Sequence, residues 1–245
     1  SLSEPNRDVT YVFYEAEEVE AERNGLGLIS AVRPEILLGD FAVVMEPSNA
    51  VIEAWCQGSM RVEVTTTGRR AHSARSWNGV NAIHAIGEVL ALLSAYQPRL
   101  PVIDGLRFHE GLNAVAISGG VAGNVVPDRA TVSVNYRFAP DRSVAEAERH
   151  LRELFSSYEM SVSDFAPGAL PGLDVPAAAA FLGAVGGRAN PKFGWTDVAR
   201  FSQLGIPAVN FGPGDPELAH KQDEHVPLAQ LSSCLDQMVG WLSSV

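Results

Sequence analysis

Cysteine is scarce in this sequence: the 245 residues contain only Cys56 and Cys234, and neither belongs to a Cys-x-x-Cys pair. So few cysteines exclude a disulfide framework. We therefore predict that both are reduced, packed thiols in a protein of the cytoplasm, where thiols stay reduced.

Long apolar runs and an excess of positive charge are also missing. No apolar stretch approaches the roughly 18 residues of a membrane span, and no basic segment followed by an apolar one opens the chain. The formal net charge is −11, whereas proteins that bind nucleic acid present a basic face. These absences predict a protein without a membrane anchor, a secretion signal or a nucleic-acid partner.

Three short segments carry carboxylates or imidazoles beside apolar runs: residues 14–18, 45–47 and 218–226. Singly they are weak, because a pair such as Glu17 and Glu18 is most often a solvated turn and a lone histidine usually lies on the surface. Together they combine nitrogen and oxygen ligands with a spare carboxylate, which a hydroxide-generating zinc site needs. The combination favours a metal-dependent hydrolytic site.

The outer parts of the chain have the pattern of an α/β sheet. Three runs are apolar on both alternating faces, which predicts strands covered on both sides: residues 9–14, 41–45 and 206–211. Residues with functional character, such as Glu46 and Gly212, follow these runs, as expected for ligand groups at the carboxyl ends of strands. A polar start and a glycine stop predict a short helix over residues 196–205.

The middle of the chain has a different pattern, with alternating strands and amphipathic helices. The predicted order is a strand at 60–67, a helix at 81–96, strands at 113–118 and 130–138, a helix opened by the Ser143–Glu146 capping box, and a strand at 159–165. This β-α-β-β-α-β order is that of a ferredoxin-like unit. We expect it to be inserted at residues 58–165 between catalytic-domain segments at 1–57 and 166–245.

Further motifs accompany the three acidic and histidine segments: residues 70–77 (Arg-Ala-His-Ser-Ala-Arg-Ser-Trp), 123–128, 135–142, 194–197 and 209–216. With these motifs in this order, the sequence resembles the two-zinc amidohydrolases, which include acetylornithine deacetylase, aminoacylase and related peptidases. The nearest branch is the succinyl-diaminopimelate desuccinylases of actinobacteria. The resemblance implies an α/β, zinc-peptidase-like catalytic domain of a mixed sheet with helices, incomplete in this chain. A ferredoxin-like lid that forms a homodimer is implied with it.

Site residues follow from the resemblance position by position. Glu17 matches the general base, and His72 matches a lid histidine that stabilises the tetrahedral oxyanion in the partner subunit's site. Glu18 and His220 match ligands of one zinc, and Glu46 a ligand of the other. Two zinc ions per site are implied, with cobalt or manganese as alternative metals.

Substrate-binding residues are implied in the same way. Asn124 and Arg137 match groups that hold the anionic ends of the substrate, a role that suits the planar fork of arginine. Gly194 and Thr196 match residues that line the substrate pocket. Without the resemblance, His72 would be interpreted as an exposed loop residue, Arg137 as a polar residue of a strand face, and Asn124 as a turn residue.

The sequence departs from the family pattern at its start, because a His-x-Asp motif and the Asp that bridges the two metals are missing. Both would precede Val9, so we expect residues 1–245 to be the C-terminal part of a longer protein and to be inactive alone. A natural short form without catalysis is the alternative.

The activity that the resemblance implies is hydrolysis of the amide of N-succinyl-LL-2,6-diaminopimelate to succinate and LL-2,6-diaminopimelate, in lysine and cell-wall precursor synthesis. One alternative is a related amidohydrolase acting on N-acetylornithine or another N-acyl amino acid. The other is a non-catalytic fragment used for dimerisation or ligand binding. The metal content of each chain would separate the enzymes from the fragment.

Overall fold

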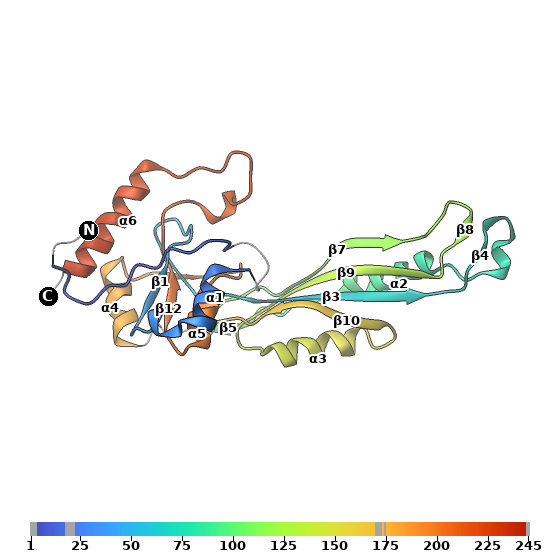
Figure 1. The fold of residues 1–245 in the computed structure, drawn as a ribbon, viewed down its shortest axis with the longest axis horizontal. Helices are drawn as coiled ribbons and strands as arrows, with labels where there is room; N and C mark the ends of the chain where they lie inside the picture. The colour runs from blue at the N-terminus through green and yellow to red at the C-terminus, as the bar shows by residue number, and fades with distance from the viewer. Residues whose placement is uncertain (1–3, 18–22, 170–172, 174, 244–245) are drawn as a thin grey trace. The chain divides into compact units, whose positions relative to one another are not determined.

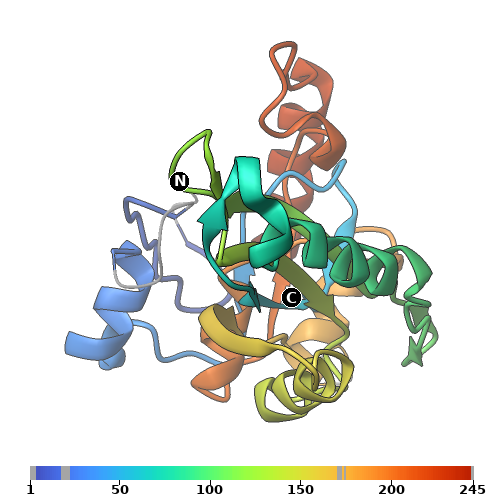
Figure 2. The same cartoon turned by 90° about the vertical axis from the view of Figure 1, so that its right-hand side faces the viewer.

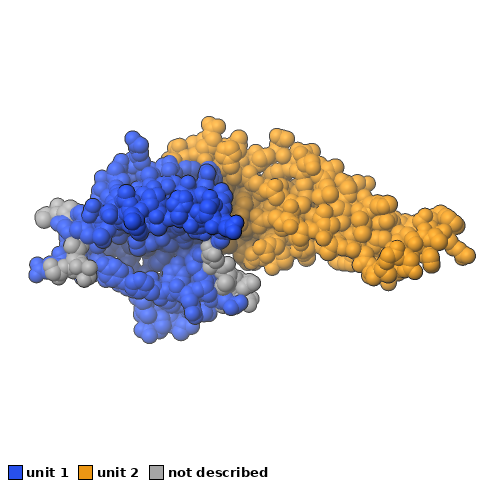
Figure 3. Space-filling model, turned by 90° about the horizontal axis from the view of Figure 1, so that it is seen from above, with its two compact units in different colours: residues 1–56, 169–245 blue, residues 57–168 orange. Residues whose placement is uncertain are grey.

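The computed structural model describes residues 4–17, 23–169, 173 and 175–243. The chain divides into two compact units, coloured separately in Figure 3. Unit 1 contains Ser1–Cys56 and Ala169–Val245, and unit 2 contains Gln57–Gly168. Both combine helices with β-sheet (Figure 1), so the fold class is α/β, as the sequence predicts.

Unit 2 is built on a four-stranded antiparallel sheet with two helices. Its main elements are β3 (Gly58–Thr67), α2 (Ala82–Ala95), β7 (Gly111–Gly119), β9 (Arg129–Phe138), α3 (Val144–Leu154) and β10 (Glu159–Ala166). The strands lie in the order β10-β3-β9-β7. The predicted β-α-β-β-α-β unit is therefore confirmed, with the first strand paired to the last and the third.

One face of this sheet carries the core of unit 2. Along β9, Val132, Val134, Tyr136 and Phe138 are fully buried, and the residues between them are only partly buried. They pack with residues of β3 and with Ile86 and other side chains of α2 and α3. Both helices lie against the sheet (Figure 2), and burying this face against them is what the alternation in the sequence specifies.

Two short antiparallel strand pairs extend unit 2. The first pairs β4 (Ala71–His72) with β8 (Val125–Val126), and the second pairs β5 (Val102–Ile103) with β6 (Leu106–Arg107). A short 3-10 helix at Ser73–Asn78 follows β4. The β4–β8 pair brings together two segments that are more than fifty residues apart in the sequence.

In its described residues, unit 1 contains a small mixed sheet, four α-helices and two short 3-10 helices, Pro34–Ile36 and Pro216–Leu218. Its elements are α1 (Gly25–Val32), β1 (Ala42–Val44), β2 (Ile52–Ala54), α4 (Pro176–Ala184), β11 (Ala189–Pro191), α5 (Val198–Gln203), β12 (Ala208–Asn210) and α6 (Leu228–Ser243). The strand order is β1-β12-β2-β11; β1 pairs with β12 in parallel, and β12 pairs with β2 antiparallel. The predicted strands at 41–45 and 206–211 and the helix at 196–205 are confirmed with shorter bounds.

The prediction of a buried strand at residues 9–14 is wrong. This segment belongs to no strand, and Tyr11 and Phe13 are 66% and 91% exposed. An apolar alternation specifies which side chains avoid water, but a strand also needs a hydrogen-bonded neighbour. No strand in the described part of the chain pairs with this segment.

Both cysteines are buried and free of disulfide bonds, as predicted. Within the described ranges, no helix is both long enough and apolar enough to cross a membrane.

Candidate functional site

Glu46 lies at the edge of the unit 1 sheet where two parallel strands end. It follows β1, and Gly212 follows the neighbouring strand β12. The two loops are interlocked: the backbone N–H of Gly212 donates to the hydroxyl of Ser48 at 3.0 Å, and the N–H of Ser48 donates to the carbonyl of Gly212 at 3.3 Å. A Cβ on Gly212 would lie 2.6 Å from the carbonyl oxygen of Glu46, so only glycine allows this approach.

A buried lysine also holds the segment that follows Glu46. The ammonium of Lys192 lies 2.7 Å from the carboxylate of Glu53 on β2 and donates to the carbonyl of Pro47 at 3.4 Å. Burial raises the pKa of the Glu53 carboxyl, and the Lys192 ammonium opposes that shift. The sequence did not predict the Lys192–Glu53 pair, because no local pattern connects Lys192 with the loop at Pro47.

Glu17 lies in a tight turn before α1. The N–H of Gly25 donates to the carbonyl of Glu15 at 2.9 Å, and the side-chain amide of Asn24 donates to the carbonyl of Glu17 at 3.1 Å. Between these two carbonyls, Ala16 has a φ of 58°. This left-handed conformation is uncommon for a residue with a Cβ and marks a backbone held by its surroundings.

Tyr14 is influenced electrostatically by three carboxylates. Burial raises the pKa of the Tyr14 hydroxyl well above its ordinary value, and the negative charge of Asp197 raises it further. The hydrogen bond to Asp197 and the charges of Glu17 and Glu46 act in the same direction. Carboxylates from distant parts of the sequence therefore contribute to the electrostatic environment of one phenol.

Asp197 is the fully buried member of this group. Its carboxylate accepts hydrogen bonds from the Asn24 amide at 3.2 Å and from the Arg200 guanidinium at 2.6 Å. The Arg200 guanidinium in turn lies over the ring of Trp195, 5.3 Å from its centre. The sequence motif at residues 194–197 contains Asp197, but no role was predicted for this residue. Its position directly after Thr196 was the only local signal.

The structure describes only some of the predicted metal ligands. Glu18 lies outside the described residues. His220 is exposed, with a φ of 63°, and its backbone N–H donates to the Glu224 carboxylate at 3.1 Å. In the ranges that the structure describes, no three His, Cys, Asp or Glu side chains are grouped so that they could hold a metal ion. The donor types fit zinc, but the described residues do not form a complete ligand set.

The predicted pocket residues Gly194 and Thr196 lie on either side of Trp195, before α5. Gly194 is exposed, whereas Thr196 is buried. Thr196 lies beside the buried thiol of Cys56: burial raises the pKa of that thiol, and hydrogen bonds to the backbone and side chain of Thr196 oppose the shift.

In unit 2, the structure brings His72 and Asn124 together. His72 pairs with Val125 across the β4–β8 ladder, and the N–H of Ser73 donates to the carbonyl of Asn124 at 2.9 Å. The Nδ1 atom of His72 accepts from the N–H of Ala74 at 3.0 Å, which leaves the other ring nitrogen as the proton donor. Both side chains are exposed.

Arg137 lies at the other end of the unit 2 sheet. In the β3–β9 ladder it pairs with Ser59, whereas Arg129 pairs with Thr67 next to the β4–β8 end. Eight residues of strand separate the two positions, about 26 Å at 3.3 Å per residue. One small ligand therefore cannot contact Arg137 and the His72–Asn124 pair of the same unit 2.

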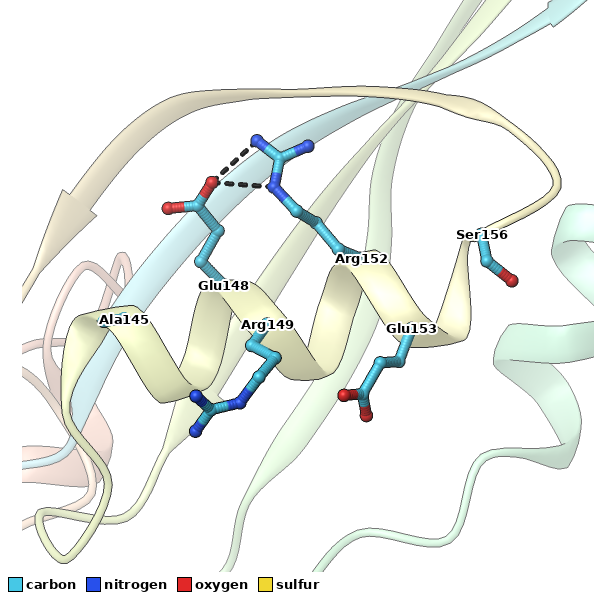
Figure 4. Close-up of a pocket in the computed structure, with 6 residues that line it drawn as sticks. All are labelled: Ala145, Glu148, Arg149, Arg152, Glu153 and Ser156. Atoms are coloured by element: carbon cyan, nitrogen blue, oxygen red, sulfur yellow. Dashed lines mark hydrogen bonds and ion pairs between the residues drawn. The ribbon is translucent and has the colours of Figure 1, made fainter.

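A shallow hollow along α3 contains none of these residues. Its lining is Ala145, Glu148, Arg149, Arg152, Glu153 and Ser156 (Figure 4). The Glu148 carboxylate accepts two hydrogen bonds from the Arg152 guanidinium, at 2.8 and 2.6 Å. These side chains form a solvated, charge-paired helix face, and we assign the hollow no chemistry.

Comparison with known proteins places these features in a family. Residues 56–161 match the model of a peptidase dimerisation domain. A Mycobacterium tuberculosis protein that carries the name of a succinyl-diaminopimelate desuccinylase is 52% identical over 244 residues, covering 99% of this chain and 69% of its own length. The succinyl-diaminopimelate desuccinylase of Corynebacterium glutamicum is 46% identical over 247 residues, covering 98% of this chain and 67% of its own length.

Solved structures show the same fold at low sequence identity. A tripeptidase of Staphylococcus aureus superposes with a TM-score of 0.68 at 20% identity, over 91% of this chain and 59% of its own. A metallo-carboxypeptidase of the M20 family from Sulfolobus solfataricus gives a TM-score of 0.67 at 15% identity, over 89% and 66% of the two chains. The chain thus spans about three fifths to two thirds of these structures.

Proposed function

Because the chain belongs to the succinyl-diaminopimelate desuccinylase family, we propose that its protein hydrolyses the amide of N-succinyl-LL-2,6-diaminopimelate. Water adds to the amide carbonyl, and the products are succinate and LL-2,6-diaminopimelate, in lysine and cell-wall precursor synthesis. The observation that carries the proposal is the relationship to these enzymes over nearly the whole chain, together with the hydrogen-bonded backbone at Glu17 and at the Glu46–Gly212 loops.

The metal is proposed to be zinc, two ions per site. Glu18 and His220 would hold one ion and Glu46 the other. When bound, the metal would lower the pKa of water and polarise the amide carbonyl. The interlocked loops at Glu46 and Gly212 support this assignment, because a ligand carboxylate needs a fixed backbone.

Glu17 is the proposed general base. It would take a proton from the attacking water and deliver it to the leaving amine, so that one carboxylate serves both halves of the reaction. Thr196 and Gly194 are proposed to line the substrate pocket, where the small Gly194 would leave room for the substrate.

His72 and Asn124 are proposed to act in the partner subunit's site of a homodimer. Their hydrogen-bonded neighbours hold them together, at the opposite end of the sheet from Arg137. That separation supports a model in which Arg137 of one subunit contacts the substrate in one active site of the dimer. The His72–Asn124 pair of the same subunit would then contact the substrate in the other active site. The matched dimerisation domain at 56–161 supports the homodimer.

We propose that unit 1 is the catalytic part and unit 2 the lid and dimerisation part. The predicted segments 1–57, 58–165 and 166–245 correspond to this division. The buried free thiols support a cytoplasmic location.

The test is a substrate panel with the full-length, zinc-loaded protein. We expect release of succinate from N-succinyl-LL-2,6-diaminopimelate, little turnover of N-acetylornithine, and loss of activity after treatment with a chelator. Zinc should restore the activity, and cobalt or manganese serve as comparisons. Efficient deacetylation of N-acetylornithine without cleavage of the succinyl amide would contradict the proposed substrate. Absence of any amide cleavage would favour a non-catalytic role.

A further inference from the structure

Asn24 connects three parts of unit 1 with one side chain. Its oxygen accepts a hydrogen bond from the N–H of Gly27 at 2.9 Å and so caps α1. Its NH₂ group donates to the Asp197 carboxylate at 3.2 Å and to the carbonyl of Glu17 at 3.1 Å. Asn24 is almost fully buried. Both N–H donors and the carbonyl oxygen of the amide are therefore used inside the protein.

Asp197 fixes the direction of that amide. Its carboxylate is fully buried and is held by Arg200 at 2.6 Å and by the hydroxyl of Tyr14. Since the carboxylate accepts, the NH₂ side of Asn24 must face it, and the oxygen must face the start of α1. The second N–H of the amide then points to the backbone of Glu17.

The contact with Glu17 lies beside a strained residue. Ala16 has a left-handed backbone, and the carbonyl of Glu15 on its other side is held by the N–H of Gly25. A left-handed alanine persists only where the surrounding structure holds it. The hydrogen bond from Asn24 to the Glu17 carbonyl is one of the contacts that restrain this turn.

We propose that Asn24 and Asp197 are positioning residues for the general base. This inference rests on the proposed role of Glu17. Asp197 orients the Asn24 amide, and the amide holds the backbone of Glu17 so that its carboxylate keeps the orientation it needs toward the attacking water. Holding a catalytic group in a reactive geometry contributes to the rate without changing substrate affinity.

The first test is Asn24→Ser in the full-length, zinc-loaded protein. Serine still caps a helix but is too short to reach Asp197 and the Glu17 carbonyl. The matched control is Asn81→Ser, since Asn81 caps α2 in unit 2 through the N–H groups of Ile83 and His84. We expect Asn24→Ser to lower kcat at least tenfold, to change KM less than threefold and to retain bound zinc, and Asn81→Ser to leave all three unchanged.

A double-mutant cycle separates positioning from a general structural defect. In a Glu17→Ala background, Asn24→Ser should lower the residual rate less than threefold, because the group that it positions is already gone. The same factor in both backgrounds would show that Asn24 acts independently of Glu17 and would overturn the proposal. An unchanged kcat in the Asn24→Ser single variant would also overturn the proposal.

A readout without turnover is amide hydrogen exchange in the segment that contains Ala16 and Glu17. Asn24→Ser should raise exchange there and Asn81→Ser should not; equal exchange in both variants contradicts the proposal. If Asn24→Ser does not accumulate as folded protein, Asp197→Asn gives the same tests with an isosteric change. Failure of the unmodified protein to cleave any amide refutes the proposed function, whereas the exchange experiment still tests the restraint on Glu17.

Discussion

At the scale of single residues, backbone strain lies beside several groups of the candidate site. Ala16 precedes Glu17, Asn49 and Ala50 follow the Glu46 segment, and His220 is itself left-handed. Such conformations cost a residue with a Cβ about 1–2 kcal/mol. They persist where surrounding contacts hold them, and they are common at functional sites. Trp55 and Asp104 are left-handed as well, so strain alone does not mark the site.

Glu17 and Glu18 are adjacent but are expected to have different tasks. Glu17→Ala in the full-length protein should retain zinc and lose about 10²–10⁴-fold in turnover, the usual range for general acid–base help, and here we expect the upper end. Glu18→Ala should lose bound zinc. Zinc stoichiometry and amide cleavage measured for both variants check this. If Glu17→Ala sheds metal and Glu18→Ala retains it, the two roles are reversed.

Gly212 should tolerate no side chain, because a Cβ would lie 2.6 Å from the Glu46 carbonyl oxygen. Gly212→Ala should displace the Glu46 segment and weaken zinc binding, measured by competition with a chelator. Gly183→Ala is the control, since its Cβ in α4 meets nothing within 4 Å. Alanine there should raise helix stability by about 0.5–1 kcal/mol and leave zinc binding unchanged. Unchanged zinc affinity in Gly212→Ala would refute the packing argument.

At the scale of elements, α3 is fixed by a capping box at its start. The Ser143 hydroxyl accepts from the N–H of Glu146, and the Glu146 carboxylate accepts from the N–H of Ser143 at 2.8 Å. Ser143→Ala should lower the free energy of unfolding by about 1 kcal/mol, measured by urea denaturation. Ser94→Ala, an exposed serine within α2, is the control. An equal effect of both substitutions would mean that the cap contributes nothing specific.

The pH dependence of this cap follows from its carboxylate. The N–H and hydroxyl of Ser143 lower the pKa of the Glu146 carboxyl below its ordinary value. A lowered folded pKa means that the contribution to stability is present above the unfolded pKa of about 4.3 and is lost as the pH falls through the folded value. The stability difference between the wild type and Ser143→Ala should therefore shrink in acid, which urea titrations at several pH values would measure.

At the scale of the whole molecule, the separation of His72 from Arg137 predicts complementation between subunits. His72→Ala and Arg137→Ala should each be nearly inactive as homodimers. In a mixed dimer, one site would receive both intact residues and the other neither. Dissociating and reassociating equal amounts of the two full-length variants should then recover about a quarter of wild-type activity, since half of the dimers are mixed. No recovery, with mixed dimers present, would place both residues in one subunit's site.

Local patterns determined the fold of unit 2. Alternation along β3 and β9, the helical spacing in α2 and the capping box of α3 are properties of short segments, so their order alone predicted the ferredoxin-like sheet. In unit 1, the apolar runs predicted β1 and β12 but also a strand at residues 9–14 that does not exist. An apolar run excludes water from a segment, but it does not supply the neighbouring strand that completes the hydrogen bonds.

The acidic and histidine segments of the candidate site were visible in the sequence, because carboxylates beside apolar runs form a local signal. Only the tertiary structure joined Asn24 to Asp197 and to the backbone of Glu17, and separated Arg137 from His72 by the length of a strand. These relations join residues up to about 180 positions apart. Strand register and loop packing decide them, and both are set by contacts between segments rather than by the composition of any one segment.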